Sequence, residues 1–129
     1  MKVVHLFAAA VAASFMSIGA VAAADSDTHQ HCFFASQFNN WRAADEKTIY
    51  IRVGVNRYFR LDIAGGCKTA TWPDSFLITK FRGSNTVCTA LDWDLKVSQP
   101  HGIAEACIVS QMTELTPDEV KALPAKAKP

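Results

Sequence analysis

The chain has 129 residues, half of them hydrophobic by type, with 13 lysines and arginines against 12 aspartates and glutamates. That length gives room for one domain and no more. A nearly neutral chain offers no basic surface for nucleic acid and no polybasic segment for anionic lipid, so both classes of partner are excluded as first hypotheses.

The first 24 residues have the order of a secretory signal peptide. A basic residue at the start precedes an apolar run at 3–18, and small residues offer cleavage sites near Ala22 to Ala24. A transmembrane anchor is the alternative, but the run is short, rich in alanine and followed by acidic residues. We therefore expect cleavage, a periplasmic or secreted protein with no membrane span, and a polar N-terminal arm at 25–31.

All four cysteines follow this segment: Cys32, Cys67, Cys88 and Cys107. An even number of cysteines in a small exported domain indicates two disulfides, each worth about 2–4 kcal/mol. The alternative is a thiol or zinc site, but no two of these cysteines have the C-x-x-C spacing that such sites commonly use. Spacing by itself leaves all three pairings open.

The segment that opens the domain is ambiguous. Phe34, Phe38 and Trp41 fit one stripe of a helix, yet the same residues suit a strand nearly as well. We favour a strand, because the pair Asn39–Asn40 is a poor centre for a helix.

Alternation of apolar and polar residues dominates the next part of the chain. The runs 48–53 and 58–63 each alternate with β-branched and aromatic residues, which is typical of strands, and together they predict a hairpin. Matching their apolar faces makes paired residue numbers sum to an even value, such as 51 with 61. The loop around 54–57 then has an odd length, three residues, with Gly54 or Asn56 available for a positive φ.

Three more strands follow, at 75–81, at 91–97 and at 106–112, and a short helix follows the last of them. In the strand at 91–97, Leu91 begins an apolar face that continues through Trp93, Leu95 and Val97. The helix begins after Thr116, whose spacing to Glu119 forms a capping box, and runs to about Leu123.

The fold class follows from these elements. Five to six short strands at close spacing, with no helices between them, predict a single mainly β domain over 32–123. Its form should be a small antiparallel sheet or partly closed barrel with one short C-terminal helix, stabilised by disulfides. Residues 124–129 should be a disordered tail.

The best candidate for binding lies on the hairpin. Arg52 and Arg60 point off one face, and with Tyr50 and Tyr58 they form a patch suited to a carboxylate, a phosphate or a glycan. The alternative is that Asp62 and solvent satisfy these arginines.

Three other groups could carry chemistry. His29 and His31, next to a cysteine, have the ligand types of a copper or zinc site, although a solvated arm is the simpler interpretation. Asp92 and Asp94 lie two residues apart, on one face of the expected strand, as acid–base pairs or cation ligands do, or simply as its wet face. His101, in a turn, could act as a general base if a partner lay nearby. No cofactor motif is present in the sequence.

A set of short motifs resembles a family of small exported bacterial proteins that is catalogued as a domain of unknown function. The motifs are Cys32–Phe33, Trp41–Arg42, the run 48–54, Tyr58, Leu61, Cys67, Val87–Cys88, Leu91–Asp92 and Cys107–Ile108. The resemblance covers about residues 32 to 123. It implies the pairs Cys67–Cys107 and Cys32–Cys88, and it brings no activity.

In two places the chain departs from this family. The segment from Cys88 to Asp92 has one extra residue, and the lipid-accepting cysteine of many members is missing, which favours a free periplasmic or secreted form. The leading hypothesis is therefore a non-enzymatic module that binds an envelope protein or a small anionic ligand. The alternative is a small periplasmic enzyme or metal-handling protein that uses His101, Asp92 and Asp94, or His29 and His31.

Overall fold

The structure, a computed structural model, describes residues 31–129. The predicted signal peptide and the arm up to residue 30 lie outside the described residues. Within them, no helix is long and apolar enough to cross a membrane.

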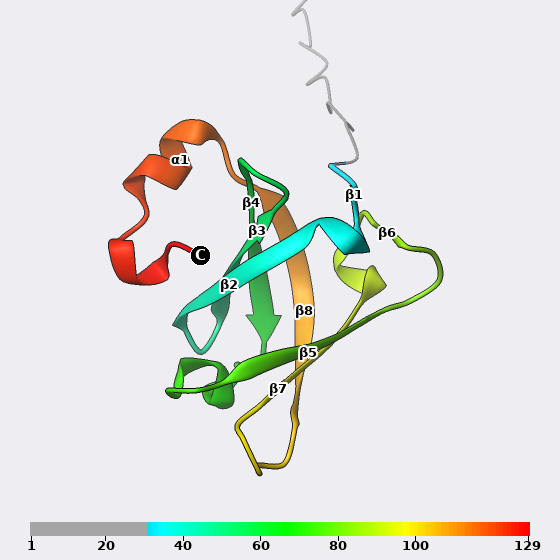
Figure 1. The fold of residues 1–129 in the computed structure, drawn as a ribbon, viewed down its shortest axis with the longest axis vertical. Helices are drawn as coiled ribbons and strands as arrows, with labels where there is room; N and C mark the ends of the chain where they lie inside the picture. Colours follow the sequence, from blue (N-terminus) through cyan, green and yellow to red (C-terminus); the bar gives the residue numbers. More distant parts are fainter. Residues whose placement is uncertain (1–30) are drawn as a thin grey trace, which may run out of the picture.

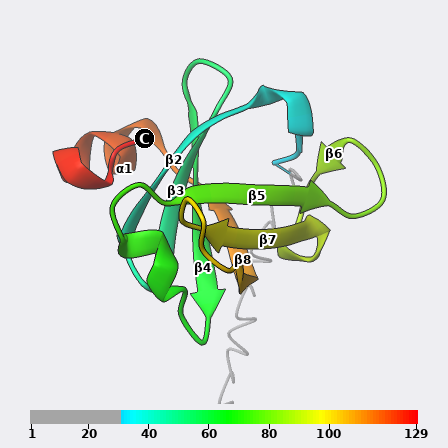
Figure 2. The same ribbon diagram turned by 60° about the horizontal axis from the view of Figure 1, so that its bottom comes forward.

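Six antiparallel strands form the main sheet in the order β2-β3-β4-β8-β7-β5. The sheet curls into a half-barrel whose two open edges are β2 and β5 (Figures 1 and 2). A two-stranded sheet pairs β1 with β6 beside it. The strands are β1 (Phe33–Phe34), β2 (Phe38–Asp45), β3 (Thr48–Val53), β4 (Arg57–Ala64), β5 (Phe76–Phe81), β6 (Thr86–Val87), β7 (Trp93–Ser98) and β8 (Glu105–Glu114). The mainly β, partly closed architecture expected from the sequence is thus confirmed.

Between residues 31 and 129, helical structure is limited to one short α-helix and four 3-10 turns. The helix is α1 (Pro117–Ala122), and the turns are η1 (Ala35–Gln37), η2 (Lys68–Thr71), η3 (Ala90–Asp92) and η4 (Ala125–Ala127). Helix α1 begins as predicted, because the Thr116 hydroxyl accepts the Glu119 N–H and the Glu119 carboxylate accepts the Thr116 N–H.

The predicted hairpin is formed by β3 and β4. Every observed pair has an even sum, and a three-residue loop follows Val53, which pairs with Arg57. The suggested pairing of Ile51 with Leu61 is wrong, because Ile51 lies opposite Phe59. The loop begins at Gly54, whose φ of 59° lies in the left-handed region that glycine adopts without steric cost.

The core fills the concave side of the curled sheet. It is built from the inward faces of β3, β4, β7 and β8, with Phe33 and Val87 of the small sheet closing one end. Its largest fully buried side chains include Phe59, Ile49 and Ile51. The alternation read in the sequence therefore gives the correct inward face for these strands.

Two other expectations need correction, and the physical reasons differ. Leu91 does not lie in the expected strand at 91–97 but in η3, and its side chain is 81% exposed. The Asp92 carboxylate accepts the N–H groups of Cys88 and Thr89, and these bonds turn the chain before β7 begins. The end of the chain is not a frayed tail: η4 packs against β2, and Ala127 is 1% exposed. Its small side chain fits against the sheet, which composition alone did not indicate.

The ambiguous opening segment is extended, as favoured, although the turn η1 divides it into β1 and β2. Two disulfides stabilise the domain, Cys32–Cys88 and Cys67–Cys107, which are the two pairs that the family resemblance implies. The first connects the start of the domain to the segment before η3, and the second connects the end of β4 to β8.

Candidate functional site

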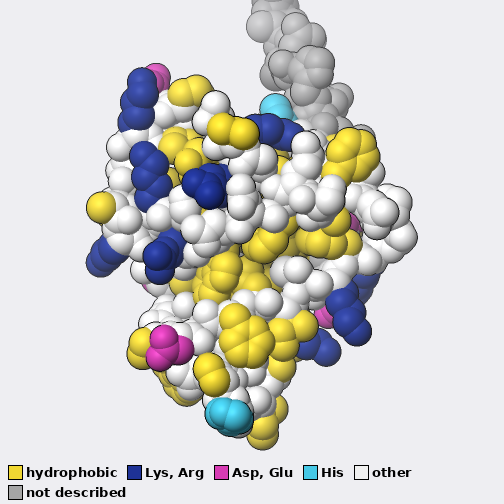
Figure 3. All heavy atoms as spheres, viewed as in Figure 1, with side chains coloured by type: hydrophobic (Ala, Val, Ile, Leu, Met, Phe, Trp, Pro, Cys, Tyr) yellow, Lys and Arg dark blue, Asp and Glu magenta, His cyan; other side chains and the backbone are white. Residues whose placement is uncertain are grey.

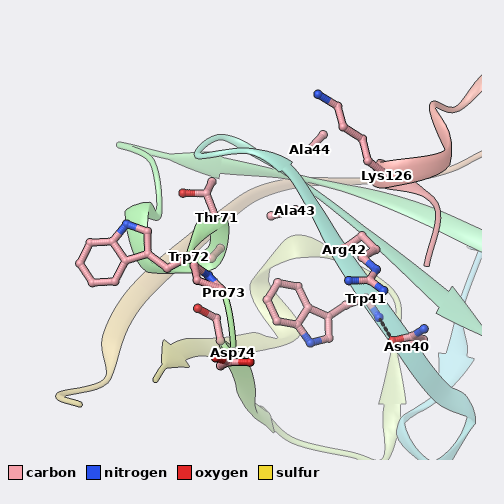
Figure 4. A pocket seen from close by; sticks show the side chains of 12 residues that line it. Asn40, Trp41, Arg42, Ala43, Ala44, Thr71, Trp72, Pro73, Asp74 and Lys126 are labelled. Atoms are coloured by element: carbon pink, nitrogen blue, oxygen red, sulfur yellow. Dashed lines mark hydrogen bonds between the residues drawn. The ribbon is translucent and has the colours of Figure 1, made fainter. Parts of the chain in front are cut away.

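A pocket of about 610 Å³ opens between the edge strand β2 and the loop that follows η2 (Figure 4). This volume lies within the range of small-ligand sites. Its walls are formed by Asn40, Trp41, Arg42, Ala43, Ala44, Ala70, Thr71, Trp72, Pro73, Asp74, Ser75 and Lys126. The pocket thus lies at one end of the opening between the two edges of the half-barrel.

One wall of the pocket is the unpaired backbone edge of β2. Five consecutive residues, 40–44, line the pocket. Because successive side chains of a strand point to opposite faces, all five can share one cavity only along the edge of the strand. Trp41 and Ala43 pack toward the core from this wall, whereas the Arg42 side chain is exposed on the outer face.

The opposite wall is a loop fixed by polar contacts. The Glu105 carboxylate accepts the N–H of Thr69 at 2.8 Å, and the hydroxyl of Ser75 donates to the carbonyl of Thr69. The side-chain amide of Gln99 donates to the carbonyl of Pro73 at 3.1 Å. The hydrogen bonds from the side chain and backbone of Thr69 hold the pKa of Glu105 below its usual value, so this carboxylate stays ionised as a loop anchor.

This loop presents an aromatic ring and a carboxylate to the pocket. Trp72 is 51% exposed, and Asp74 adopts a φ of 61°, which aspartate tolerates better than most residues. In Figure 4, the Trp41 indole projects from β2 toward Pro73 and Asp74, whereas the Trp72 indole extends from the loop away from Trp41. A ligand entering the pocket would therefore contact the Trp41 indole on the β2 side and Pro73 and Asp74 on the loop side, with Trp72 at the rim.

Basic side chains outnumber acidic ones around the pocket. Arg42 and Lys126 lie on its rim against a single carboxylate, that of Asp74. In the part of the chain that the structure describes, neither cation forms an ion pair with an acidic residue. Figure 3 shows further lysines and arginines gathered over β2 and the C-terminal segment, above an apolar hollow. The electrostatic environment of the pocket therefore favours an anionic ligand.

Comparison with known proteins identifies the family of the chain. The sequence model of DUF6491, a family of unknown function, matches residues 2–128. The chain belongs to this family. No curated protein and no solved structure matches it. Membership of DUF6491 confirms the resemblance described from the cysteine and hairpin motifs, and it leaves the function to be argued from the site.

In this DUF6491 protein the hairpin patch lies on the outer face of the sheet. Tyr50 lies opposite Arg60, and Arg52 lies opposite Tyr58, so the four predicted residues are cross-strand neighbours. The guanidinium of Arg60 is paired with Asp62 at 2.7 Å, while the buried Nε of Arg52 has no hydrogen-bond partner within the described range 31–129. Whether this patch binds a ligand stays a prediction.

The two carboxylates considered for acid–base work are not brought together. Asp92 accepts the N–H groups of Cys88 and Thr89, each at 2.8 Å, and these bonds hold its pKa below the usual value. Asp94 lies on β7, opposite Lys80 of β5. Asp92 therefore caps the turn η3, which comes before β7. The expectation that Asp92 and Asp94 share one face of a strand is wrong, because only Asp94 lies in the strand.

The two histidines of the described range do not lie together, because Cys32, next to His31, is bonded to Cys88 near the start of β7, whereas His101 follows the end of that strand. His101 is exposed, with a φ of 65°, in the turn after β7, at the opposite end of that strand from Asp94. His31 contacts Glu114, with Nδ1 at 2.6 Å from Oε2. His29 lies outside the described residues. Over residues 31–129, Cys67, Glu105 and Cys107 are the only group of three residues placed to share a metal ion, and both cysteines are held in a disulfide.

The pocket itself was missed by the sequence reasoning. In the sequence, Trp72–Pro73–Asp74 lies just before the expected strand 75–81, and Trp41 lies in the ambiguous opening segment. Nothing in their spacing, 31 positions apart in the chain, indicates that they share a cavity. The tryptophan at position 72, directly before the turn residues Pro73 and Asp74, is a local signal for a binding loop, since loops commonly carry binding groups.

Proposed function

We propose that the protein is an exported, non-catalytic binding module, and that its ligand site is the pocket between β2 and the η2–β5 loop. The observation that carries the proposal is the pocket's combination of two tryptophans with two cations that lack ion-pair partners in the described chain. Aromatic faces supply contact area, and an unpaired guanidinium binds carboxylate or phosphate in a defined orientation.

The part of the proposal that concerns export rests on two features. The first 24 residues have the pattern of a cleaved signal peptide, and all four cysteines of the chain are paired in disulfides, which persist in oxidising compartments. Fractionation of the producing cells tests it. The mature chain should be found in the periplasm or medium with a mass that lacks about residues 1–24, and an uncleaved chain in the cytoplasm would contradict it.

A non-catalytic role is proposed because the groups considered for catalysis serve other purposes or lie apart. Asp92 caps η3, Asp94 faces Lys80, and His101 lies beyond the far end of β7. General acid–base catalysis needs such groups within hydrogen-bonding reach of one substrate. The arrangement of these groups in the described residues 31–129 therefore supports a binding module over the alternative of an enzyme or metal-handling protein.

Site-specific photo-crosslinking in the native envelope tests the site. A photoreactive amino acid would replace Trp72 at the pocket rim, Tyr58 on the hairpin patch, or Val55 at the hairpin tip, which is 83% exposed. The proposal predicts a specific adduct at position 72 that is lost on adding Trp41→Ala, with none at position 55. An adduct at 58 but not at 72 would move the site to the hairpin patch, and equal labelling at 55 and 72 would contradict a specific site.

A further inference from the structure

We infer that the ligand of this pocket is an extended peptide segment that adds to the open edge of β2 as a further strand and carries acidic side chains toward Arg42 and Lys126. This inference rests on the proposed function, because it names the ligand class of the same pocket. Peptides bind in this way to exposed sheet edges in several unrelated domains, with main-chain hydrogen bonds giving affinity and side chains giving specificity.

The register of the sheet shows which backbone groups face the opening. The carbonyl of Lys47 accepts the N–H of Ile63, so the odd-numbered residues of β3 bond toward β4 and its even-numbered residues bond toward β2. Those even-numbered residues are Tyr50 and Arg52, which lie opposite Arg42 and Asn40. By alternation, the backbone groups of Trp41 and Ala43 point away from the sheet, into the pocket.

The hydrogen bond of Trp41 agrees with this assignment. Its backbone N–H is donated not to β3 but to the side-chain oxygen of the adjacent Asn40, at 2.9 Å. The groups left for an incoming chain are therefore the carbonyl of Trp41 and both the N–H and the carbonyl of Ala43. This is the bonding pattern that one short extended peptide would complete.

The edge is limited on both sides, which fits a short occupant. The pairing of β2 with β3 is irregular between Phe38 and Asn40 and again between Ala43 and Asp45. Irregularities of this kind bend an edge strand and prevent long pairing with other chains. The stretch available for addition is thus the four residues 40–43, all of which line the pocket.

The side chains around this edge specify the composition of the peptide. Trp41 and Ala43 face the core side, and Pro73 lines the opposite wall, so inward-pointing residues of the peptide would be apolar. Arg42 points to the outer face and Lys126 lies on the same rim, so outward-pointing residues would be acidic. Alternation of apolar and acidic residues matches the period of a strand.

The test uses the mature chain and synthetic peptides. The probe is a capped hexapeptide of alternating valine and glutamate, and the matched control peptide has lysine in place of glutamate. Binding is measured by calorimetry, and amide hydrogen exchange of Ala43 is followed by NMR. We expect the glutamate peptide to bind at least about tenfold more tightly than the lysine peptide and to protect the Ala43 amide, because strand addition engages that N–H.

Two variants separate the contributions of backbone and charge. Ala43→Pro removes the outward N–H, and a proline there is tolerated because it breaks no bond to β3. Arg42→Ala removes the cation, and Arg82→Ala, an exposed arginine just past the other edge strand, is the control. The first two should weaken binding of the glutamate peptide at least about tenfold, while Arg82→Ala should leave it unchanged.

Three results would overturn the inference: no binding of the glutamate peptide, equal binding of the lysine peptide, or binding without protection of Ala43. If Ala43→Pro fails to fold, Arg42→Ala and the exchange measurement still decide. A specific crosslink at position 72 together with no peptide binding would leave the pocket as a ligand site and reject only the peptide. Absence of both would reject the proposed function as well.

Discussion

Arg57 and Glu114 form a two-pronged ion pair between residues that are 57 positions apart in the chain. The Nε of Arg57 lies 2.7 Å from Oε1, and its Nη2 lies 2.9 Å from Oε2. A third nitrogen, Nη1, donates to the carbonyl of Cys32 at 3.1 Å, and the guanidinium lies over the ring of Phe59. One side chain therefore ties the start of β4 to the end of β8 and to the first disulfide.

Removing the charge of Glu114 should destabilise the domain. Glu114→Gln leaves a half-buried guanidinium without its carboxylate, so we expect the free energy of unfolding to fall by about 1–2 kcal/mol. Denaturant titration measures this. Asp118→Asn is the control: its side chain is 95% exposed and 3.7 Å from Lys121, so its change should be below about 0.5 kcal/mol. Equal effects would contradict the structural role of Glu114.

The same pair predicts how stability depends on pH. The hydrogen bonds from Arg57, and then its charge and that of His31, hold the pKa of Glu114 below the ordinary value of 4.5. The unfolded carboxyl therefore takes up its proton first as the pH falls. The stabilisation should be complete above pH 4.5 and be lost as the pH drops through the lower pKa of the folded state. Glu114→Gln should flatten the acid limb of a stability–pH curve, and an unchanged limb would refute the assignment.

The two disulfides should differ in their sensitivity to reductant. Cys67 and Cys107 are 0% and 3% exposed in the core, whereas Cys32 and Cys88 are half-buried near the small sheet. Thiol–disulfide exchange needs access to a sulfur, so low concentrations of dithiothreitol should open Cys32–Cys88 first. Alkylation followed by peptide mass mapping gives the order. Earlier labelling of Cys67 or Cys107 would be inconsistent with the burial.

The C-terminal turn η4 should be held by one small side chain. Ala127→Glu places a charge in a position that is 1% exposed, and we expect the segment to detach from β2, since an unpaired buried charge costs several kcal/mol. Trypsin should then cut after Lys126 at least about tenfold faster. Ala125→Glu, at an exposed position of the same turn, is the matched control. Similar rates in both variants would mean that the turn is not anchored.

Arg57 and Arg60 of the hairpin should contribute differently to the free energy of unfolding. Arg60 is exposed and pairs only with Asp62, two residues along the same strand. Arg60→Ala should therefore change the free energy of unfolding by less than about 0.5 kcal/mol, whereas Arg57→Ala should lower it by about 1–2 kcal/mol. Thermal and denaturant unfolding of the two variants compare them. A larger loss for Arg60→Ala would reverse the assignment.

Much of the local structure could be predicted from the sequence. The strands β3 and β4 and their three-residue loop follow from alternation, because one buried face fixes which side chains point inward. The cap of α1 follows from Thr116 and Glu119, which satisfy each other's backbone groups without any distant partner. These features depend on neighbours within a few residues.

The sequence prediction failed where a hydrogen bond, a packing contact or a long-range ion pair determined the structure instead of local alternation. Leu91 alternates correctly for a strand, yet the carboxylate of Asp92 bends the chain into η3 first. Ala127 reads as part of a polar tail, yet it fits against β2. The Arg57–Glu114 pair was not predicted, because no local pattern relates residues so far apart.

The sequence by itself determined the fold class, the hairpin and the number of disulfides, because each of these depends on composition or on the two-residue period of a strand. The tertiary structure alone decided that β2 and β5 remain open edges, and that Trp41 and the loop 72–75 line one pocket with Arg42 and Lys126 on its rim. The curl of the sheet sets both, because it brings together segments that no spacing in the chain connects.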